Sequence, residues 1–93
     1  MPVPSGTTVP LSVVLITRNA AAQLGPCLES VRFADDIVVV DSGSTDDTRA
    51  LAARHGARVI EHAWMGFGRQ KQFAVDAARL DWVLCLDADE RVS

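Results

Sequence analysis

The chain has 93 residues, of which 48% are hydrophobic and 23% are charged, and its formal net charge is -3. This length and composition are typical of a single small globular domain. The charge shows no basic excess that would indicate a nucleic-acid partner. There is also no apolar stretch of about 18 residues that would predict a membrane-spanning helix.

The first ten residues contain three prolines and one glycine, and they predict a flexible leader over residues 1–10. The folded part is therefore expected to cover residues 11–93. Four short apolar segments follow, and their valine and isoleucine content favours β-strands. Three of the four are almost continuously apolar, which is typical of strands that are covered on both faces. The predicted strands are Leu11–Ile16, Ile37–Val40, Arg58–Ile60 and Trp82–Leu86.

A first helix is predicted between the first two strands, at about 21–31. Leu24, Leu28 and Val31 recur there at helical spacing. Pro26 favours a later start, because proline is best tolerated in the first turn of a helix.

The second and third helices have different signals at their ends. Ser44 or Thr45 is expected to cap the second helix, and Gly56 is expected to end it. The third helix is predicted from about Gly68 to Arg79.

Strands and helices therefore alternate along the chain. This order predicts an α/β fold with three layers, in which about four parallel strands form a Rossmann-like sheet with right-handed crossovers. Ligands of such sheets bind beyond the carboxyl ends of the strands. Polar residues follow each predicted strand, and we expect them to gather at this edge; they are Thr17-Arg18-Asn19, Asp41-Ser42-Gly43-Ser44, Glu61-His62 and Asp87-Ala88-Asp89-Glu90.

The acidic motif after the last strand is a candidate metal site. Asp87 and Asp89 are two residues apart, so they point the same way in an extended segment. Two converging carboxylates repel each other unless a cation or a proton lies between them, and hard oxygen ligands suit Mg²⁺ or Mn²⁺. The alternative is a solvated acidic turn that ends the strand.

Other candidate binding residues lie in the remaining turns. Asp41 comes too early to cap the second helix, and its carboxylate could accept a hydrogen bond from a nucleobase or a ribose. Arg18, Arg69 and Lys71 could neutralise a diphosphate, or they could be solvated surface charges.

The loop over residues 61–68 contains His62 and Trp64, and two glycines make it adaptable. It could fold over a ligand, but a packed Trp64 and a solvent-exposed His62 are at least as good an interpretation.

Several nucleotide and hydrolase folds can be excluded by their motifs. The turn after the first strand has no GxGxxG, which argues against a dinucleotide-binding dehydrogenase. The chain also has no GxxxxGK[ST] phosphate loop and no GxSxG nucleophile elbow.

The series VVLITRN, VVVDSGSTDDT, HAWMGFGRQKQFA and DWVLCLDADERVS resembles the GT-A fold, family 2 glycosyltransferases, over about Leu11 to Ser93. Within that family, SGSTD, W-x-G-F-G-x-Q-K and LDADE are similar to bacterial enzymes that add glucose or a related sugar to the lipopolysaccharide inner core. The resemblance implies a nucleotide-diphospho-sugar donor and inversion of the anomeric centre by direct displacement.

The resemblance also implies roles for individual residues. Arg18 would lie near the nucleobase, and Asp41 would bond the uracil or the ribose. Arg69 and Lys71 would contact the base or the diphosphate. The two aspartates would have different roles, because Asp87 would lie close to the ribose and Asp89 would hold the Mg²⁺ or Mn²⁺. Gln72 departs from the pattern, because many relatives have asparagine there.

Such enzymes are much longer, and their general base lies downstream of the acidic motif. We therefore expect an N-terminal donor-binding part that has no catalytic base of its own and turns over little. The acceptor, a lipid-linked or other glycan, would bind through the missing part. The alternative is a non-catalytic binding or assembly module that keeps the fold. A sugar-nucleotide pyrophosphorylase is disfavoured, because its glycine-rich first turn is absent.

Two expectations concern the setting of the protein. The segment Trp82–Leu86 would form an unpaired hydrophobic edge, which predicts a homo-oligomer. Cys27 and Cys85 have no metal-ligand spacing and are expected to be reduced core thiols. Together with the absence of a secretory signal, this predicts a cytoplasmic protein, with peripheral contact at the inner membrane face as an option.

Overall fold

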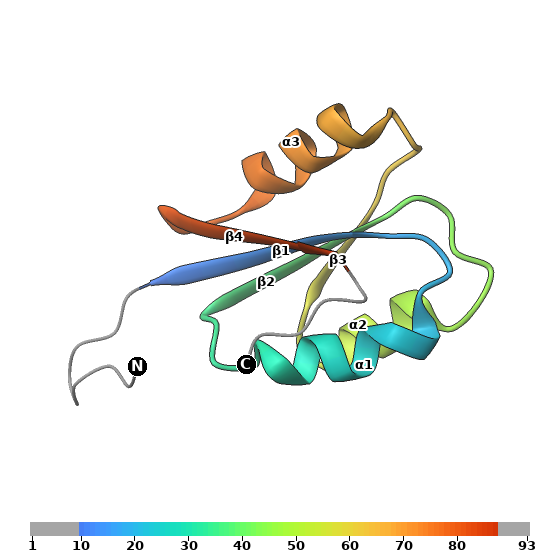
Figure 1. Ribbon diagram of the computed structural model, residues 1–93, viewed down its shortest axis with the longest axis horizontal. Helices are drawn as coiled ribbons and strands as arrows, with labels where there is room; N and C mark the ends of the chain where they lie inside the picture. Colours follow the sequence, from blue (N-terminus) through green and yellow to red (C-terminus); the bar gives the residue numbers. More distant parts are fainter. Residues whose placement is uncertain (1–9, 88–93) are drawn as a thin grey trace.

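A computed structural model describes residues 10–87 of the chain. A parallel four-stranded sheet in the order β3-β2-β1-β4 lies between two helical layers (Figure 1), which confirms the predicted three-layer α/β fold. The elements follow each other as β1 (Leu11–Thr17), α1 (Ala21–Ser30), β2 (Asp36–Asp41), α2 (Thr48–Arg54), β3 (Arg58–Glu61), α3 (Phe67–Ala77) and β4 (Trp82–Asp87).

The helices cover both faces of the sheet. Helices α1 and α2 lie on one face and α3 lies on the other (Figure 1). The central strand β1 shows the result, because Val13 and Leu15 belong to the core under α1 while Val14 belongs to the core under α3. Burial on both faces explains why β1 and β2 are almost continuously apolar in sequence.

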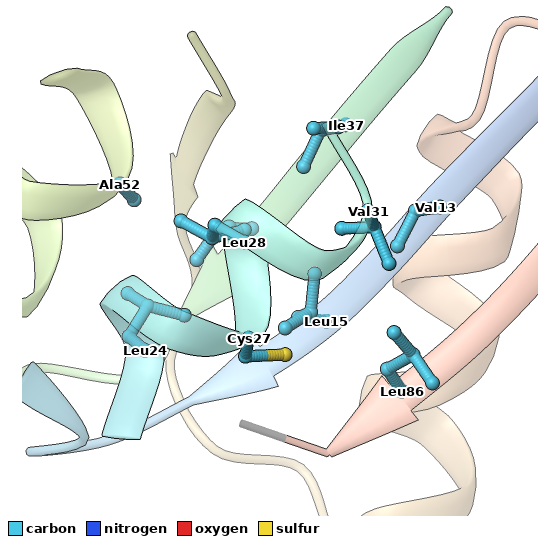
Figure 2. Close-up of a cluster of buried hydrophobic side chains, with 10 residues drawn as sticks. Val13, Leu15, Leu24, Cys27, Leu28, Val31, Ile37, Ala52 and Leu86 are labelled. Carbon is cyan, nitrogen blue, oxygen red and sulfur yellow. The ribbon is translucent and has the colours of Figure 1, made fainter. Parts of the chain in front are cut away.

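The larger core lies between the sheet and α1. Leu24, Cys27 and Leu28 project from α1 onto the sheet and are almost completely buried, as Figure 2 shows. They meet Leu15 of β1 and Leu86 of β4 there. Each buried leucine stabilises the fold by about 1.5–3 kcal/mol.

Helix α1 begins at Ala21 with Pro26 inside it, so the expectation of a later start was wrong. The backbone N–H of Ala20 donates to Thr48 Oγ1 at 2.9 Å, and that of Ala21 donates to Asp46 Oδ2 at 3.2 Å. These long-range contacts fix the start of the helix, and the buried apolar face offsets the backbone hydrogen bond that Pro26 cannot make.

Helix α2 begins at Thr48, so the expected caps Ser44 and Thr45 lie outside it, and the expectation was wrong. The N-cap residue is Asp47, whose side chain makes no capping hydrogen bond, and the carboxylate of the preceding Asp46 accepts a hydrogen bond from the Thr48 backbone N–H at 3.0 Å. The predicted end is confirmed. The helix stops at Arg54, and Gly56 follows with φ at 83°, a conformation that favours glycine.

At the amino edge of the sheet, Asp36 joins several elements. Its carboxylate accepts hydrogen bonds from Ser12 Oγ at 2.8 Å, from Arg58 Nε and Nη2 at 3.0 Å, and from the Arg79 backbone N–H at 3.1 Å. Burial alone would raise the pKa of Asp36, but these hydrogen bonds and the Arg58 charge hold the pKa at about 2. Arg58 also donates to the Ala77 carbonyl at the end of α3. Asp36 therefore ties β1, β2, β3 and the α3–β4 connection together.

Strand β4 lies at an edge of the described sheet, as the sequence predicted. Trp82 at its start is 63% exposed. Cys85 is also exposed, which corrects the expectation of two buried thiols; only Cys27 is buried. Self-association through this edge stays a prediction.

Candidate functional site

The carboxyl ends of the four parallel strands meet at one edge of the sheet, as expected. Thr17 pairs with Asp41 in register, Asp41 pairs with Glu61, and Ile16 pairs with Asp87. The loops that follow these strands therefore share one border of the molecule, where ligands of open α/β sheets bind.

A pocket of about 300 Å³ opens at this edge. It takes residues from β1, from the turns after β1 and β2, from the loop before α3, from the first residue of α3 and from the end of β4. Its lining residues are Ile16, Thr17, Arg18, Ser42, Trp64, Phe67 and Asp87. The wall thus combines one cation, one carboxylate, two hydroxyl residues and two aromatic rings.

Two of the sequence-predicted residues, Arg18 and Asp87, meet in this pocket. Arg18 is exposed in the turn after β1. Asp87 is exposed as the last residue of β4, and its backbone carbonyl lies 3.7 Å from Cys27 Sγ. A guanidinium and a carboxylate that border one pocket can bind a polar ligand that carries both acceptor and donor groups.

Asp41 is buried and does not belong to the pocket wall. Its side chain has no exposed surface. One carboxylate oxygen accepts hydrogen bonds from the hydroxyls of Thr17 and Ser44, and the other accepts them from the backbone N–H groups of Gly43 and Ser44. These four hydrogen bonds are internal to the turns after β1 and β2, and contact of Asp41 with a base or ribose stays a prediction.

The hydrogen bonds also set the charge state of Asp41. Burial alone would raise the pKa of this carboxyl group, but the hydrogen bonds from Ser44, Thr17 and Gly43 outweigh burial and hold the pKa below its ordinary value. Asp41 therefore stays ionised and shapes the turn after β2. That turn presents the next residue, Ser42, to the pocket.

Asn19 joins the turn after β1 to the turn after β2. Its backbone is in the left-handed region with φ at 50°, which asparagine tolerates better than most residues. Its side-chain oxygen accepts hydrogen bonds from the Thr45 N–H at 2.7 Å and the Asp46 N–H at 3.4 Å, and its own N–H donates to Ser44 Oγ at 2.8 Å. The two turns that carry Arg18 and Ser42 are thus held as one unit.

Arg69 and Lys71 lie apart from the pocket wall, on the exposed first turns of α3. Lys71 borders a separate small cavity between α3 and β4, and its Nζ lies 6.0 Å from the centroid of the Phe67 ring. The structure therefore does not bring these two cations together with Arg18. Asp89, the predicted metal ligand, lies outside the described residues.

In the loop before α3, the interpretation of a packed Trp64 and a solvent-exposed His62 was wrong. His62 is partly buried, and its ring packs against Phe73 in a tilted arrangement, with the centroids 4.1 Å apart and the planes 43° apart. Trp64 is the exposed residue, and it lines the pocket together with Phe67. Phe67 was not predicted as a site residue, and Ser42 was expected only as one of the polar residues that gather at this edge. An aromatic residue in a glycine-containing loop at the carboxyl edge was the only available signal for Phe67.

Residues 10–87 contain no cluster of three or more histidine, cysteine, aspartate or glutamate side chains that could hold a metal ion by themselves. A divalent cation near Asp87 would therefore need further oxygen ligands from a bound molecule or from residues beyond those described. In the same part of the chain, no helix is long and apolar enough to cross a membrane.

The sequence and the fold both match known proteins. The family model described as glycosyl transferase family 2 matches residues 12–93. A lipopolysaccharide core biosynthesis glycosyltransferase from Rhizobium meliloti is 42% identical over 89 residues, which is 90% of this chain and 33% of that protein. An uncharacterized glycosyltransferase from Rickettsia felis is 45% identical over 84 residues, which is 89% of this chain and 30% of that protein.

Two solved structures show the same architecture. Mannosyl-3-phosphoglycerate synthase from Rubrobacter xylanophilus matches with a TM-score of 0.78 and 32% identity, over 91% of this chain and 32% of that one. Glucosyl-3-phosphoglycerate synthase from Mycobacterium tuberculosis was solved in complex with Mn²⁺, uridine diphosphate and glucosyl-3-phosphoglycerate. It matches with a TM-score of 0.76 and 28% identity, over 89% of this chain and 36% of that one. The chain thus spans about a third of the length of these relatives.

Proposed function

Because this chain belongs to glycosyl transferase family 2, we propose that it forms the nucleotide-sugar donor-binding part of an inverting, metal-dependent glycosyltransferase. The observation that carries this proposal is the pocket at the carboxyl edge of the sheet, where Arg18, Ser42 and Asp87 meet. A donor of this kind joins a base, a ribose, a diphosphate and a sugar, so it needs both polar and apolar contacts. The pocket wall offers both.

Four polar residues at or next to the pocket have roles in this proposal. Arg18 provides a cation and several N–H donors for the base or the diphosphate. Asp87 accepts hydrogen bonds from ribose hydroxyls at the end of β4. Ser42 adds a hydroxyl on the opposite side, and Asp41 acts as a positioning residue that holds Ser42 in place. Donor binding is assigned to this chain, whereas deprotonation of the acceptor is not.

Arg69 and Lys71 contribute differently. Both are exposed on α3 and outside the pocket wall. They add positive charge beside the opening, and this charge attracts an anionic donor over a distance of about 10 Å at ordinary ionic strength. Direct contact with the diphosphate would require it to extend toward α3.

A divalent cation is part of this proposal, and Asp87 is the one carboxylate that the described pocket wall offers it. Mg²⁺ and Mn²⁺ take hard oxygen ligands and commonly use one or two carboxylates together with substrate phosphates. Asp87 provides a carboxylate at the pocket, and Asp89 would provide the carboxylate that holds the ion. When bound, the cation neutralises negative charge on the leaving nucleotide as the glycosidic bond breaks. The relative from Mycobacterium tuberculosis was solved with Mn²⁺ and uridine diphosphate, which supports this choice.

The name of the relative from Rhizobium meliloti assigns that protein to lipopolysaccharide core biosynthesis, which supports a role of the parent protein in glycan synthesis. We propose that the parent protein builds this core or another cell-envelope glycan, with a lipid-linked or glycan acceptor. The two reduced cysteines agree with a cytoplasmic setting, at or near the inner face of the membrane.

Titration calorimetry with UDP-glucose, with and without Mn²⁺, tests the proposal. We expect binding that strengthens with Mn²⁺ and loses this dependence in Asp89→Ala. Asp81→Ala is the matched control, because Asp81 is an exposed aspartate just before the other end of β4. If UDP-glucose does not bind under any metal condition, or if both variants behave alike, the proposal is refuted.

A further inference from the structure

Two carboxylates lie side by side at the edge of the sheet that carries the pocket. Asp41 ends β2 and Glu61 ends β3, and the two residues pair in register. Successive side chains of a strand alternate between the faces of a sheet. Val39 and Val59, two residues earlier in these strands, pack in the core under α1, so Asp41 and Glu61 also face the side that α1 and α2 cover (Figure 1). Like charges directly opposite each other are destabilising, so this pair needs a counter-charge.

Arg49 of α2 provides that counter-charge. Its guanidinium forms an ion pair with Glu61, and its Nε lies 3.9 Å from Asp41 Oδ2. Its Nη2 also donates a hydrogen bond to the Ser44 carbonyl at 3.3 Å. A guanidinium carries five N–H donors in a planar fork, so one arginine can serve several acceptors at once. Arg49 therefore joins the turn after β2 to the end of β3.

The two segments that Arg49 joins lead into two parts of the pocket wall. Ser42 follows Asp41 directly, and the loop that carries Trp64 begins directly after Glu61. Arg49 itself does not line the pocket. An effect of Arg49 on a ligand in the pocket would therefore act through these neighbours.

Stability alone does not account for this arrangement. The side chains of Arg49 and Glu61 are 42% and 64% exposed, and ion pairs between exposed groups contribute little to the free energy of unfolding. Asp41, in contrast, stays ionised, because its hydrogen bonds hold its pKa below the ordinary value. Without Arg49, this edge would present unbalanced negative charge next to the pocket, and such a charge repels an anionic ligand.

We propose that Arg49 is a positioning residue for donor binding: it neutralises Asp41 and Glu61 and keeps the turn after β2 joined to the end of β3, so that this edge accepts an anionic diphosphate. The inference rests on the proposed donor binding and adds a residue outside the pocket wall. Direct contact between Arg49 and the diphosphate fits less well, because acceptors of the protein already surround the guanidinium.

Calorimetry on the full chain with uridine diphosphate and with uridine, at constant Mn²⁺, tests the proposal. Uridine diphosphate keeps a net negative charge with one Mn²⁺ bound, whereas uridine is neutral. Arg49→Met keeps an apolar stem and removes the charge. It should weaken uridine diphosphate binding on the order of 5-fold in about 0.1 M salt and leave uridine binding unchanged. In about 1 M salt, where the screening length is about 3 Å, this loss should largely disappear.

Further variants separate charge from packing. Adding Glu61→Gln to Arg49→Met removes the unbalanced carboxylate, so the double variant should regain most of the lost affinity. Arg49→Lys keeps the charge and should lose less affinity than Arg49→Met. Arg54→Met is the matched control, because Arg54 is exposed in the last turn of the same helix. It should bind uridine diphosphate as the unsubstituted chain does.

The outcomes separate this inference from the proposed function. The positioning role is refuted, while donor binding stands, if Arg49→Met binds uridine diphosphate as tightly as the unsubstituted chain. It is also refuted if the loss is the same for uridine, persists in about 1 M salt and is not recovered in the double variant. If Arg49→Met does not fold, Glu61→Gln alone decides, since removal of one negative charge should not weaken binding and a weaker binding would refute the role. If the unsubstituted chain binds neither ligand, the proposed function and the inference are refuted together.

Discussion

Replacing Asp36 with asparagine removes the charge that joins β1, β2, β3 and the α3–β4 connection. The pKa of Asp36 falls from 3.8 to about 2 in the folded protein, and one pKa unit corresponds to about 1.36 kcal/mol. The ionised carboxylate therefore contributes about 2 kcal/mol to the free energy of unfolding at neutral pH. Its side chain is only 9% exposed, so solvent screening reduces this value little. Against a typical total of about 5–15 kcal/mol, this loss is substantial.

The sign follows from the lowered pKa. The contribution is present above the unfolded pKa of 3.8 and is lost as the pH falls through the folded value of about 2. Urea unfolding followed by circular dichroism should therefore show that Asp36→Asn is about 2 kcal/mol less stable at pH 7 than the same protein without the substitution. The difference should shrink to well under 1 kcal/mol near pH 2.

Asp81→Asn provides the control, because Asp81 is an exposed carboxylate just before β4. It should change the unfolding free energy by no more than about 0.5 kcal/mol at either pH. A loss in Asp36→Asn that stays the same from pH 7 to pH 2 would refute the reasoning, since the effect would then come from packing and not from the charge.

Three further predictions concern other parts of the fold. Asp41→Ala leaves four hydrogen-bond donors without their acceptor, and two of them are backbone N–H groups. It should therefore lower the unfolding free energy by about 3 kcal/mol or more in urea titrations. A near-neutral result would contradict the role of Asp41 in supporting the turn. Gly56→Ala should cost about 1 kcal/mol because φ is 83°, whereas Gly68→Ala, inside α3, should stabilise slightly; equal effects in thermal melts would argue against backbone strain. Cys85 should react quickly with a thiol reagent under native conditions, and Cys27 only on unfolding; simultaneous labelling in a mass-spectrometric time course would contradict the described burial.

The fold could be predicted from the sequence because its signals are local. The two inner strands, β1 and β2, are buried on both faces, so they are recognised in the sequence as runs of valine and isoleucine. Gly56 ends α2 because glycine can adopt a positive φ. The gathering of polar turns at one edge follows from parallel topology alone. These signals can be recognised in the sequence without knowledge of the distant contacts that pair the strands.

The errors arise where distant residues decide local structure. Pro26 suggested a later helix start, but Thr48 and Asp46 fix the start of α1 from another turn. Ser44 has the chemistry of a cap, yet its hydroxyl is used by Asp41 and Asn19. Such choices depend on tertiary contacts that no local pattern contains.

The candidate site could be predicted in part. Arg18 and Asp87 both line the pocket, as their places after the first and fourth predicted strands indicated. Burial separates Asp41 from Ser42, although the two are neighbours in sequence, because successive residues at a strand end face different surroundings. The binding roles of all six predicted residues stay predictions; they are Arg18, Asp41, Arg69, Lys71, Asp87 and Asp89.

The position of β1 in the middle of the sheet has a consequence for how the molecule assembles. Thr17 pairs with Asp41 only 24 residues away, whereas Leu11 pairs with Trp82, 71 residues away. The entropy lost in closing a loop grows with its length, and pairings between distant segments slow folding. We therefore expect β1, β2 and α1 to form first and β4 to join last. Since Asp87 belongs to β4, we expect the pocket to be completed only in the final folding step. The turns after β1 and β2, which Asn19 joins, should form before that step.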